Sequence, residues 1–345
     1  MRVGFKGESV GERLFLATGM IPELAMVPMI SMVVNNAFFA AQRLGIMNLL
    51  EEGAHSAEAV AQAVDADPHA VQVLLEALTG FGYLEREDGR FQYSQALRKS
   101  FAGRSAEMAR SMAAFAPDVA RKFESLDQAV TTGEVADFHF NPVNAQQWGH
   151  YLTFLKLSAD RPTRAIVDNV KLGSTPRRML DVAGGPAMYS IAFCERYPEL
   201  ETVILDLPES AEEGEKEIAK AGLTDRISYQ IGDLVSADWG TGYDIVLLSN
   251  MLHCFKEPEC CKIIDMAFAA LGPEGVLITN EPGFPGEGEN IDTFAAFTSL
   301  LYFTVTGGRT HPTPEIERWL SDAGFASVTR QHGGRQTQVI GRKGA

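Results

Sequence analysis

Residues 179–187 read MLDVAGGPA, and this stretch decides the fold class of the second half of the chain. An apolar run ends in an acid and is followed at once by small residues. This order is typical of a buried strand that turns tightly into a helix. Small residues at such a turn let the backbone approach a ligand closely. We therefore expect the first strand of a parallel sheet, with a binding turn at its carboxyl end.

Further apolar runs follow at a pitch of roughly 25 residues, with helical stretches between them. They are residues 203–206, 227–230, 245–248 and 276–279. This alternation predicts an α/β fold with a Rossmann-like doubly wound sheet. Residues 326–330 and 336–340 flank two glycines, which predicts an antiparallel hairpin at the C-terminal end.

The first half of the chain has a helical pattern instead. Ser56 is placed to cap a helix over residues 57–64, and Asp67-Pro68 opens another. The Asp88-Gly89 pair that follows predicts a small hairpin. Two short helices before a hairpin outline a winged helix.

The pattern changes near residue 170. We expect residues 1–170 to form a mostly helical, winged-helix-like domain and residues 171–345 to form the sheet domain. The same winged-helix outline serves DNA-binding proteins and dimerisation modules. Its composition has to decide between the two.

Charge argues against DNA. The expected recognition helix, residues 69–79, has no Lys or Arg and carries Glu76, while the whole chain has a formal net charge of −15. Such a surface repels a phosphate backbone. We expect no nucleic-acid partner, and a winged-helix regulator that senses a metabolite is kept as a distant alternative.

The segment Leu24–Gln42 carries no charge, but it contains Pro28, Asn35 and Asn36. A signal peptide begins with basic residues, and a membrane span is more uniformly apolar. We expect a buried helix and no membrane partner. Because an exposed apolar patch of this size favours aggregation, we expect a dimer interface to bury this segment.

The cysteines are Cys194, Cys254, Cys260 and Cys261. None of their spacings suits a zinc site, and the adjacent pair suits neither a normal disulfide nor a metal clip. We therefore expect no metal and a reducing, cytoplasmic location.

The ends of the next two strands carry polar residues. Asp206 ends the second strand, where a carboxylate can accept hydrogen bonds from ribose hydroxyls, and Gly232-Asp233-Leu234 follows the third. The dinucleotide pattern G-x-G-x-x-G fails, since Ala183 and Met188 stand at two of its glycine positions. No glycine-rich turn here carries a P-loop lysine. These residues predict an adenosine ligand without phosphates and disfavour a nicotinamide dehydrogenase.

The motifs resemble those of the S-adenosylmethionine-dependent O-methyltransferases of the plant caffeate and hydroxyindole type, with their bacterial relatives. The family's D-V-G-G-G-x-G, D-L-P, G-D-F, L-H-D-W-x-x-x-x-C and A-G-F correspond, in order, to residues 181–187, 206–208, 232–234, 252–260 and 323–325. The resemblance covers nearly the whole chain. It implies a winged-helix dimerisation domain and a homodimer.

The resemblance also implies the cofactor, S-adenosyl-L-methionine, with S-adenosyl-L-homocysteine as its product. The residues that it assigns to this ligand are Asp181, Ala183, Gly184, Gly185, Asp206, Leu207, Asp233, Leu234, Ser249 and Asn250. For Asp181, capping of the following helix is an equal alternative.

By the same resemblance, His253 is the general base for the acceptor hydroxyl, and Glu281 steadies it. The family's second acid is missing, since Thr310 stands at its position, and Cys254 replaces the Asp that follows the histidine. From the residue type alone, His253 is better read as an ordinary histidine at the start of a helix. Its position after the fourth strand, with Glu281 after the fifth, favours the catalytic reading instead. His311 is a weaker candidate base.

The acceptor is expected to be a flat aromatic or polyketide-like molecule that binds between the domains. The expected pocket residues are Trp148, Tyr151, Phe154, Leu155, Phe297 and Leu301. Because of the departures at positions 254 and 310, methylation of carbon or nitrogen without an essential histidine base remains the alternative.

Overall fold

The computed structural model describes residues 23–103, 106–136, 139, 145–170, 172, 175–333 and 335–345. By packing, the chain divides into two compact units between Pro117 and Asp118. This boundary lies ahead of the one predicted at residue 170. The reason is that the long helix α9 (Ala145–Asn169) packs on helices α10 and α11 of the second unit.

The first unit has the winged-helix outline. Its elements are α2 (Glu23–Arg43), α3 (Ile46–Glu52), α4 (Ala57–Ala63), α5 (Pro68–Gly80), β1 (Leu84–Glu87), β2 (Arg90–Tyr93), α6 (Gln95–Ser100) and most of α7 (Ala106–Phe123). The predicted caps are present: Ser56 Oγ accepts the Ala59 N–H at 3.2 Å, and an Asp67 oxygen accepts the Ala70 N–H at 2.8 Å.

Helix α2 is exposed in the single chain. Of its residues with described side chains only Ala41 is buried, while Met29, Met32 and Val33 are each about half exposed or more (56%, 57% and 49%). The helix that we predicted over residues 24–42 is therefore present, but its burial within the chain is wrong. Among the described residues, Ala25–Arg43 is also the one stretch that length and composition alone would allow to cross a membrane.

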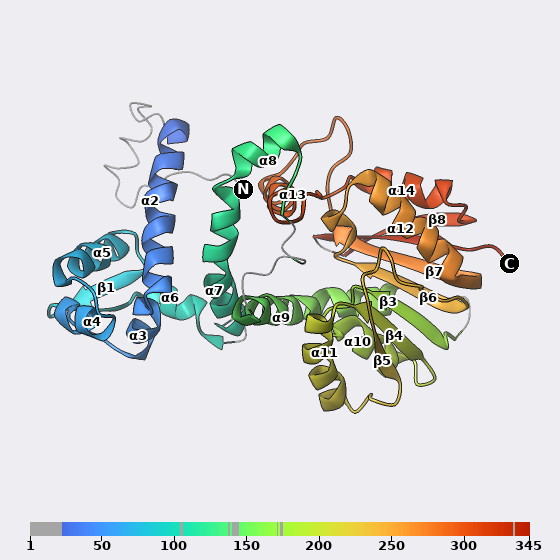
Figure 1. Ribbon diagram of the computed structural model, residues 1–345, viewed down its shortest axis with the longest axis horizontal. Coiled ribbons are helices and arrows are strands. Elements are labelled where there is room, and N and C mark those ends of the chain that lie inside the picture. The colour runs from blue at the N-terminus through green and yellow to red at the C-terminus, as the bar shows by residue number, and fades with distance from the viewer. Residues whose placement is uncertain are drawn as a thin grey trace. The chain divides into compact units, whose positions relative to one another are not determined.

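The second unit is built on a seven-stranded sheet with the order β5-β4-β3-β6-β7-β9-β8 (Figure 1). The strands are β3 (Arg178–Val182), β4 (Glu201–Asp206), β5 (Ile227–Ile231), β6 (Tyr243–Ser249), β7 (Leu271–Pro282), β8 (Ser327–Gly333) and β9 (Gln336–Arg342). Strands β3 to β7 are parallel, and β9 pairs antiparallel with both β7 and β8. The predicted doubly wound sheet and C-terminal hairpin are confirmed.

Helices cover both faces of this sheet. Helices α12 (Glu257–Ala270) and α14 (Thr313–Asp322) bury one face, and α9, α10 (Met188–Arg196) and α11 (Pro208–Ala221) bury the other (Figure 1). Alternate residues of β3 enter the two cores: Leu180 and Val182 enter the first, and Met179 enters the second. Helices α8 (Leu126–Thr132) and α13 (Thr293–Thr306) and the 3-10 helix η2 (Leu252–Cys254) complete the unit.

The strand order places the site. The chain runs outward from β3 through β4 to β5 and then returns to β6 on the other side of β3. Ligands of open α/β sheets bind at the carboxyl ends of the strands where the order reverses in this way. The ends of β3, β4 and β5 therefore form one half of the site, and the ends of β6 and β7 form the other.

Candidate functional site

The turn after β3 has the backbone shape of a glycine-rich loop, although two of its glycine positions hold alanine. Ala183, Gly185 and Ala187 have φ angles of 55°, 54° and 66°, which lie in the left-handed region. For an alanine this conformation costs roughly 1–2 kcal/mol. At Gly184 no side chain fits, since an added Cβ would lie 2.8 Å from Asp181 Cγ and from Ile204 Cγ2. The loop thus keeps its close approach to the neighbouring strand.

Asp206 at the end of β4 holds this loop. One of its oxygens accepts the Gly185 N–H at 2.7 Å, and the other accepts the Leu207 N–H at 2.7 Å. Burial raises the pKa of the Asp206 carboxyl above its usual range, although both backbone donors act in the opposite direction. Ser210 is a further hydrogen-bonding neighbour of this carboxylate, whose oxygens have about four acceptor lone pairs in all, so acceptor capacity remains for a ligand hydroxyl.

A residue that we did not predict supports the loop from β5. The Tyr229 hydroxyl donates to the Gly185 carbonyl at 2.6 Å. It reaches that atom across α11 only because Gly214 has no side chain, since a Cβ there would lie 1.7 Å from the hydroxyl oxygen. No motif spacing links residues 185, 214 and 229, and only the packing of the helix on the sheet brings them together.

Asp181 is buried inside the same corner. Ser190 of α10 donates to its Oδ2 at 2.6 Å, while Oδ1 has no hydrogen-bond partner among the described residues. Burial raises the pKa of Asp181 to about 7, and the nearby Asp206 adds to this shift. The Ser190 contact is compatible with the helix-capping alternative. A direct contact with the ligand stays a prediction.

This raised pKa predicts a pH-dependent effect of Asp181→Asn. Between the ordinary value of about 4 and about 7, the folded state holds a proton that the unfolded state has lost, so stability falls as pH rises through this window. The variant lacks this penalty. We expect the difference in melting temperature, variant minus wild type, to increase from pH 5 to pH 7 and then level off. A constant difference in thermal melts, equal to that of the exposed control Asp225→Asn, would contradict this expectation.

Asp233 and Leu234 lie in the turn after β5. Asp233 Oδ1 accepts the Val235 N–H at 3.0 Å, and the Leu234 carbonyl accepts the Trp239 indole N–H at 2.8 Å. Gly232 donates its N–H to the Asp206 carbonyl at 3.0 Å, so this turn adjoins the end of β4. The predicted adenine contact stays a prediction, but both residues are at the expected edge of the sheet.

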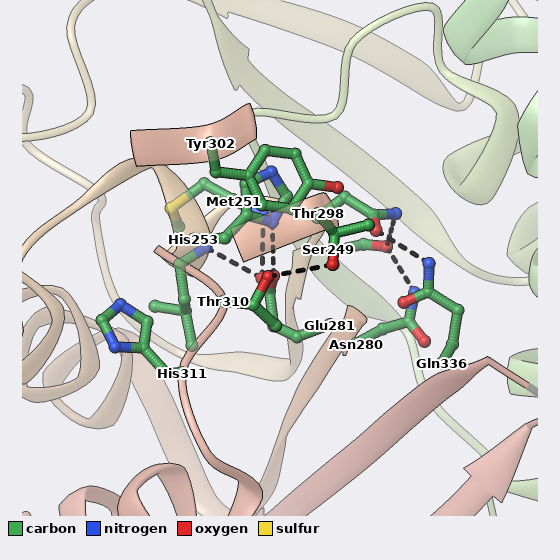
Figure 2. A network of polar contacts seen from close by, with 12 residues as sticks. Ser249, Met251, His253, Asn280, Glu281, Thr298, Tyr302, Thr310, His311 and Gln336 are labelled. Carbon is green, nitrogen blue, oxygen red and sulfur yellow. Dashed lines mark hydrogen bonds and ion pairs between the residues drawn. The ribbon is translucent and has the colours of Figure 1, made fainter. Parts of the chain in front are cut away.

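His253 and Glu281 form the most tightly built part of the site (Figure 2). His253 Nδ1 lies 2.6 Å from Glu281 Oε2, and both side chains are nearly fully buried. A carboxylate oxygen can only accept here, so Nδ1 carries the proton and Nε2 is the basic nitrogen. Glu281 Oε1 also accepts the N–H groups of Met251 and Leu252, each at 2.8 Å. One carboxylate thus fixes both the imidazole and the 3-10 helix that carries it.

Helix α13 and the loop after it cover this pair. The Tyr302 ring stacks on the His253 imidazole with 3.6 Å between centroids and 17° between planes. Thr310, at the position of the missing acid, donates its hydroxyl to Thr298 at 3.4 Å (Figure 2). Gly308 packs on the backbone of His253, since a Cβ there would lie 2.2 Å from the His253 carbonyl oxygen. Sequence reasoning missed Tyr302 because it stands among other aromatic residues of an apolar helix.

Ser249 and Asn250, which we predicted to bind the cofactor, belong to a chain of amide hydrogen bonds at the end of β6 (Figure 2). Asn280 and Asn250 both donate to Ser249 Oγ, at 3.0 and 3.3 Å. Gln336 donates to Asn250 and Gln338 donates to Asn280. Asn280 directly precedes Glu281, so this network joins the His253 pair to the centre of the sheet.

His311 is turned away from His253 (Figure 2). Its Nε2 donates to the Phe255 carbonyl at 3.0 Å, and burial lowers its pKa below the usual range. It lines a cavity of about 540 Å³ with residues such as Leu300 and Phe303, and neither His253 nor Glu281 is among the lining residues. His311 thus makes a structural contact away from His253, and the second-base role stays a prediction.

The expected pocket residues fall into two groups. Trp148 and Tyr151 of α9 form an aromatic cluster with His139, whose Nε2 lies 3.2 Å from the Tyr151 hydroxyl. His139 also acts electrostatically on Asp206, and Leu155 lies close to Gly185, so part of this group is near the cofactor edge. The remaining expected residues are Phe154, which is half-buried on α9, and Leu301 and Phe297 on α13, of which Phe297 is exposed. Their contact with an acceptor stays a prediction.

The part of the chain that the structure describes has no evident metal site. There, no three or more His, Cys, Asp or Glu side chains are grouped so that they could hold a metal ion. None of the described cysteines is in a disulfide.

The chain matches two family models and several known proteins. A family model described as the O-methyltransferase domain matches residues 143–326, and one described as the O-methyltransferase dimerisation domain matches residues 29–98. A 3-hydroxy-5-methyl-1-naphthoate 3-O-methyltransferase of Streptomyces sahachiroi is 30% identical, over 84% of this chain and 85% of that protein.

Two further comparisons bear on the chemistry and the fold. An L-tyrosine C(3)-methyltransferase of Streptomyces lavendulae is 28% identical, over 85% of this chain and 83% of the relative. Among solved structures, an O-methyltransferase family protein from Burkholderia thailandensis superposes with a TM-score of 0.78 at 21% identity, over 93% of this chain and 97% of the other.

Proposed function

Because the chain belongs to the O-methyltransferase family, we propose that it transfers a methyl group from S-adenosylmethionine to a hydroxyl of an aromatic small molecule, with His253 as general base. The single observation that carries this proposal is the His253–Glu281 pair at 2.6 Å. It lies at the ends of β6 and β7, beside the strand ends that form the other half of the site.

The residues at the ends of β3 and β4 fit this cofactor. Asp181 and Asp206 are close enough for one carboxylate to raise the pKa of the other. Two neighbouring acids, one buried and one half-buried, favour a cationic ligand and disfavour the pyrophosphate of a dinucleotide. Asp206 would hold the ribose hydroxyls through the lone pairs that its two backbone contacts leave free.

When bound, S-adenosylmethionine supplies a methyl group that is already activated by a positive sulfur. The protein's work is therefore to align the acceptor and to accept its proton. Alignment of reacting groups contributes up to roughly 7–11 kcal/mol. His253 Nε2 would take the proton of the acceptor hydroxyl, and Glu281 would stabilise the resulting imidazolium through Nδ1–H.

We infer an aromatic acceptor from two observations. The relative from Streptomyces sahachiroi is named for a hydroxylated naphthoate. In this chain, Trp148 and Tyr151 cluster with His139, which acts electrostatically on Asp206, and Tyr302 stacks on His253. A flat acceptor buries the most apolar surface against such rings.

Methylation of a ring carbon is the second candidate, since a relative of similar identity is named for C-methylation of tyrosine. The two reactions differ in product. Purified protein is incubated with S-adenosylmethionine and a panel of hydroxynaphthoates and hydroxybenzoates, and the products are identified by NMR. A methyl ether supports O-transfer, whereas an aryl methyl carbon would replace that proposal with C-transfer.

The exposed face of α2 predicts a homodimer. The dimerisation-domain match includes most of this helix, and its exposed Met29, Met32 and Val33 offer apolar surface that a second copy can cover. Changing Met32 and Val33 together to Glu is expected to yield monomer in light scattering, because two charges would be buried unpaired at the interface.

The control for the dimer prediction is the same double change at exposed apolar positions outside α2, Val130 and Ile231. It should leave the dimer intact. A wild-type protein that is already monomeric, or that binds neutral phospholipid vesicles through α2, would contradict the proposal that a second copy of the chain buries the exposed face of α2.

A further inference from the structure

The Tyr302 ring covers one face of the proposed base. Its centroid is 3.6 Å from that of the His253 imidazole, and the two planes differ by 17°. Glu281 fixes the imidazole within its plane through Nδ1, but a single in-plane hydrogen bond leaves the ring free to swing about that contact. A ring stacked on the face removes this freedom.

The stack also adds to the support that Glu281 gives the protonated base. The family resemblance implies a second acid at position 310, where this chain has Thr310, whose hydroxyl donates to Thr298. The face of an aromatic ring is negative and attracts a cation placed over it. Burial and the nearby Glu281 raise the pKa of the Tyr302 hydroxyl above its usual range, so the ring is neutral and acts through its face.

We propose that Tyr302 is a positioning residue that fixes the plane of the His253 imidazole and stabilises its protonated form, in place of the missing second carboxylate. This inference rests on the proposed role of His253 as the base. It assigns to α13 a part in proton transfer in addition to the lining of a pocket.

Other titratable groups around His253 are few among the described residues. Glu281 approaches it from β7, and Cys254 is its neighbour in η2. Cys260 of α12 and His311 before α14 pack behind the same turn, where Cys260 contacts the Leu252 carbonyl and His311 the Phe255 carbonyl. Burial raises the pKa of the Cys260 thiol and lowers that of His311, so both are uncharged near neutral pH. Changes in the titration of His253 on altering Tyr302 thus report on the stack itself.

The test is an NMR titration of the seven imidazoles in the protein bound to S-adenosylhomocysteine, with His253 assigned by the loss of one signal in His253→Gln. Loss of the ring in Tyr302→Leu removes support for the cation, so the titration midpoint of His253 is expected to fall by about half a pH unit or more. Tyr302→Phe keeps the ring and should retain the wild-type midpoint. The control Tyr197→Leu removes a different stacked pair, with Phe193, and should leave His253 unchanged.

Kinetics give the second readout. The neutral imidazole is the active form, so a lower midpoint moves the acidic limb of the kcat profile to lower pH. A base weaker by half a pH unit also lowers the plateau, by up to about threefold in Tyr302→Leu. An unshifted midpoint in Tyr302→Leu, or a Tyr302→Phe that behaves like Tyr302→Leu, would overturn the proposal. The titration needs no acceptor, so it tests the stack independently of the reaction. If the midpoint shifts in Tyr302→Leu but His253→Ala is fully active, the role of His253 as the base is refuted while the effect of Tyr302 on His253 stands.

Discussion

Replacing His253 by alanine is expected to lower kcat for methyl transfer by about 10²–10⁴-fold, the usual contribution of a positioned general base. A phenol has a pKa of about 10 and is largely protonated at neutral pH. Without Nε2 the proton has no acceptor aligned with the attack. Binding of S-adenosylhomocysteine should stay within a few-fold of the wild type, because His253 lies at the ends of β6 and β7 and outside the β3–β5 edge.

The matched variant for this prediction is Glu281→Gln. The amide keeps an acceptor oxygen for the N–H groups of Met251 and Leu252, but it removes the negative charge opposite Nδ1. We expect a smaller loss of kcat than in His253→Ala, and a double variant no worse than His253→Ala alone, since both residues act through one imidazole. A His253→Ala protein with wild-type kcat would favour carbon methylation of an acceptor that needs no base.

Replacing Asp206 by alanine is expected to weaken S-adenosylhomocysteine binding by about 100-fold or more, since hydrogen bonds to a charged group are worth about 1.5–3 kcal/mol each. The variant loses the acceptor for two ribose hydroxyls. It also frees the N–H groups of Gly185 and Leu207, which Asp206 holds at 2.7 Å. The cofactor loop then loses its link to β4. The dissociation constant is measured by calorimetric titration.

The control is Asp238→Ala. Asp238 is exposed and also accepts a backbone N–H, that of Gly240 at 2.9 Å, but it lies beyond the turn that contains Asp233. Its replacement should leave the dissociation constant unchanged. Asp206→Ala that binds within threefold of the wild type would place the ribose elsewhere.

Much of the fold could be predicted because its signals are local. The runs around Leu180 and Val246 are short and apolar, and the caps at Ser56 and Asp67 are specified by one residue each. The packing boundary at Pro117 could not be read in this way. It depends on which unit the amphipathic helix α9 covers, and a helical pattern does not name its partner. The exposure of α2 has the same origin, since an apolar face looks alike whether it meets a core or a second copy.

The site divides along similar lines. His253 and Glu281 could be predicted because one follows β6 and the other lies at the end of β7, and the ends of neighbouring parallel strands meet. Tyr302, Tyr229 and His139 could not, because their roles come from contacts across helices that no spacing encodes. The alanines at positions 183 and 187 looked like departures from a glycine loop, yet the backbone there keeps the left-handed conformation.

The measurement that tests the account most directly is a calorimetric titration of freshly purified, ligand-stripped wild-type protein with S-adenosylhomocysteine, beside an identical titration with NAD. It comes before any acceptor screen, because the absence of the right acceptor is enough to make a screen fail even when the cofactor site works. We predict binding in the micromolar range for S-adenosylhomocysteine and none for NAD. Folded protein that binds neither ligand, or that binds NAD alone, would contradict the proposed cofactor site and the methyl transfer that depends on it.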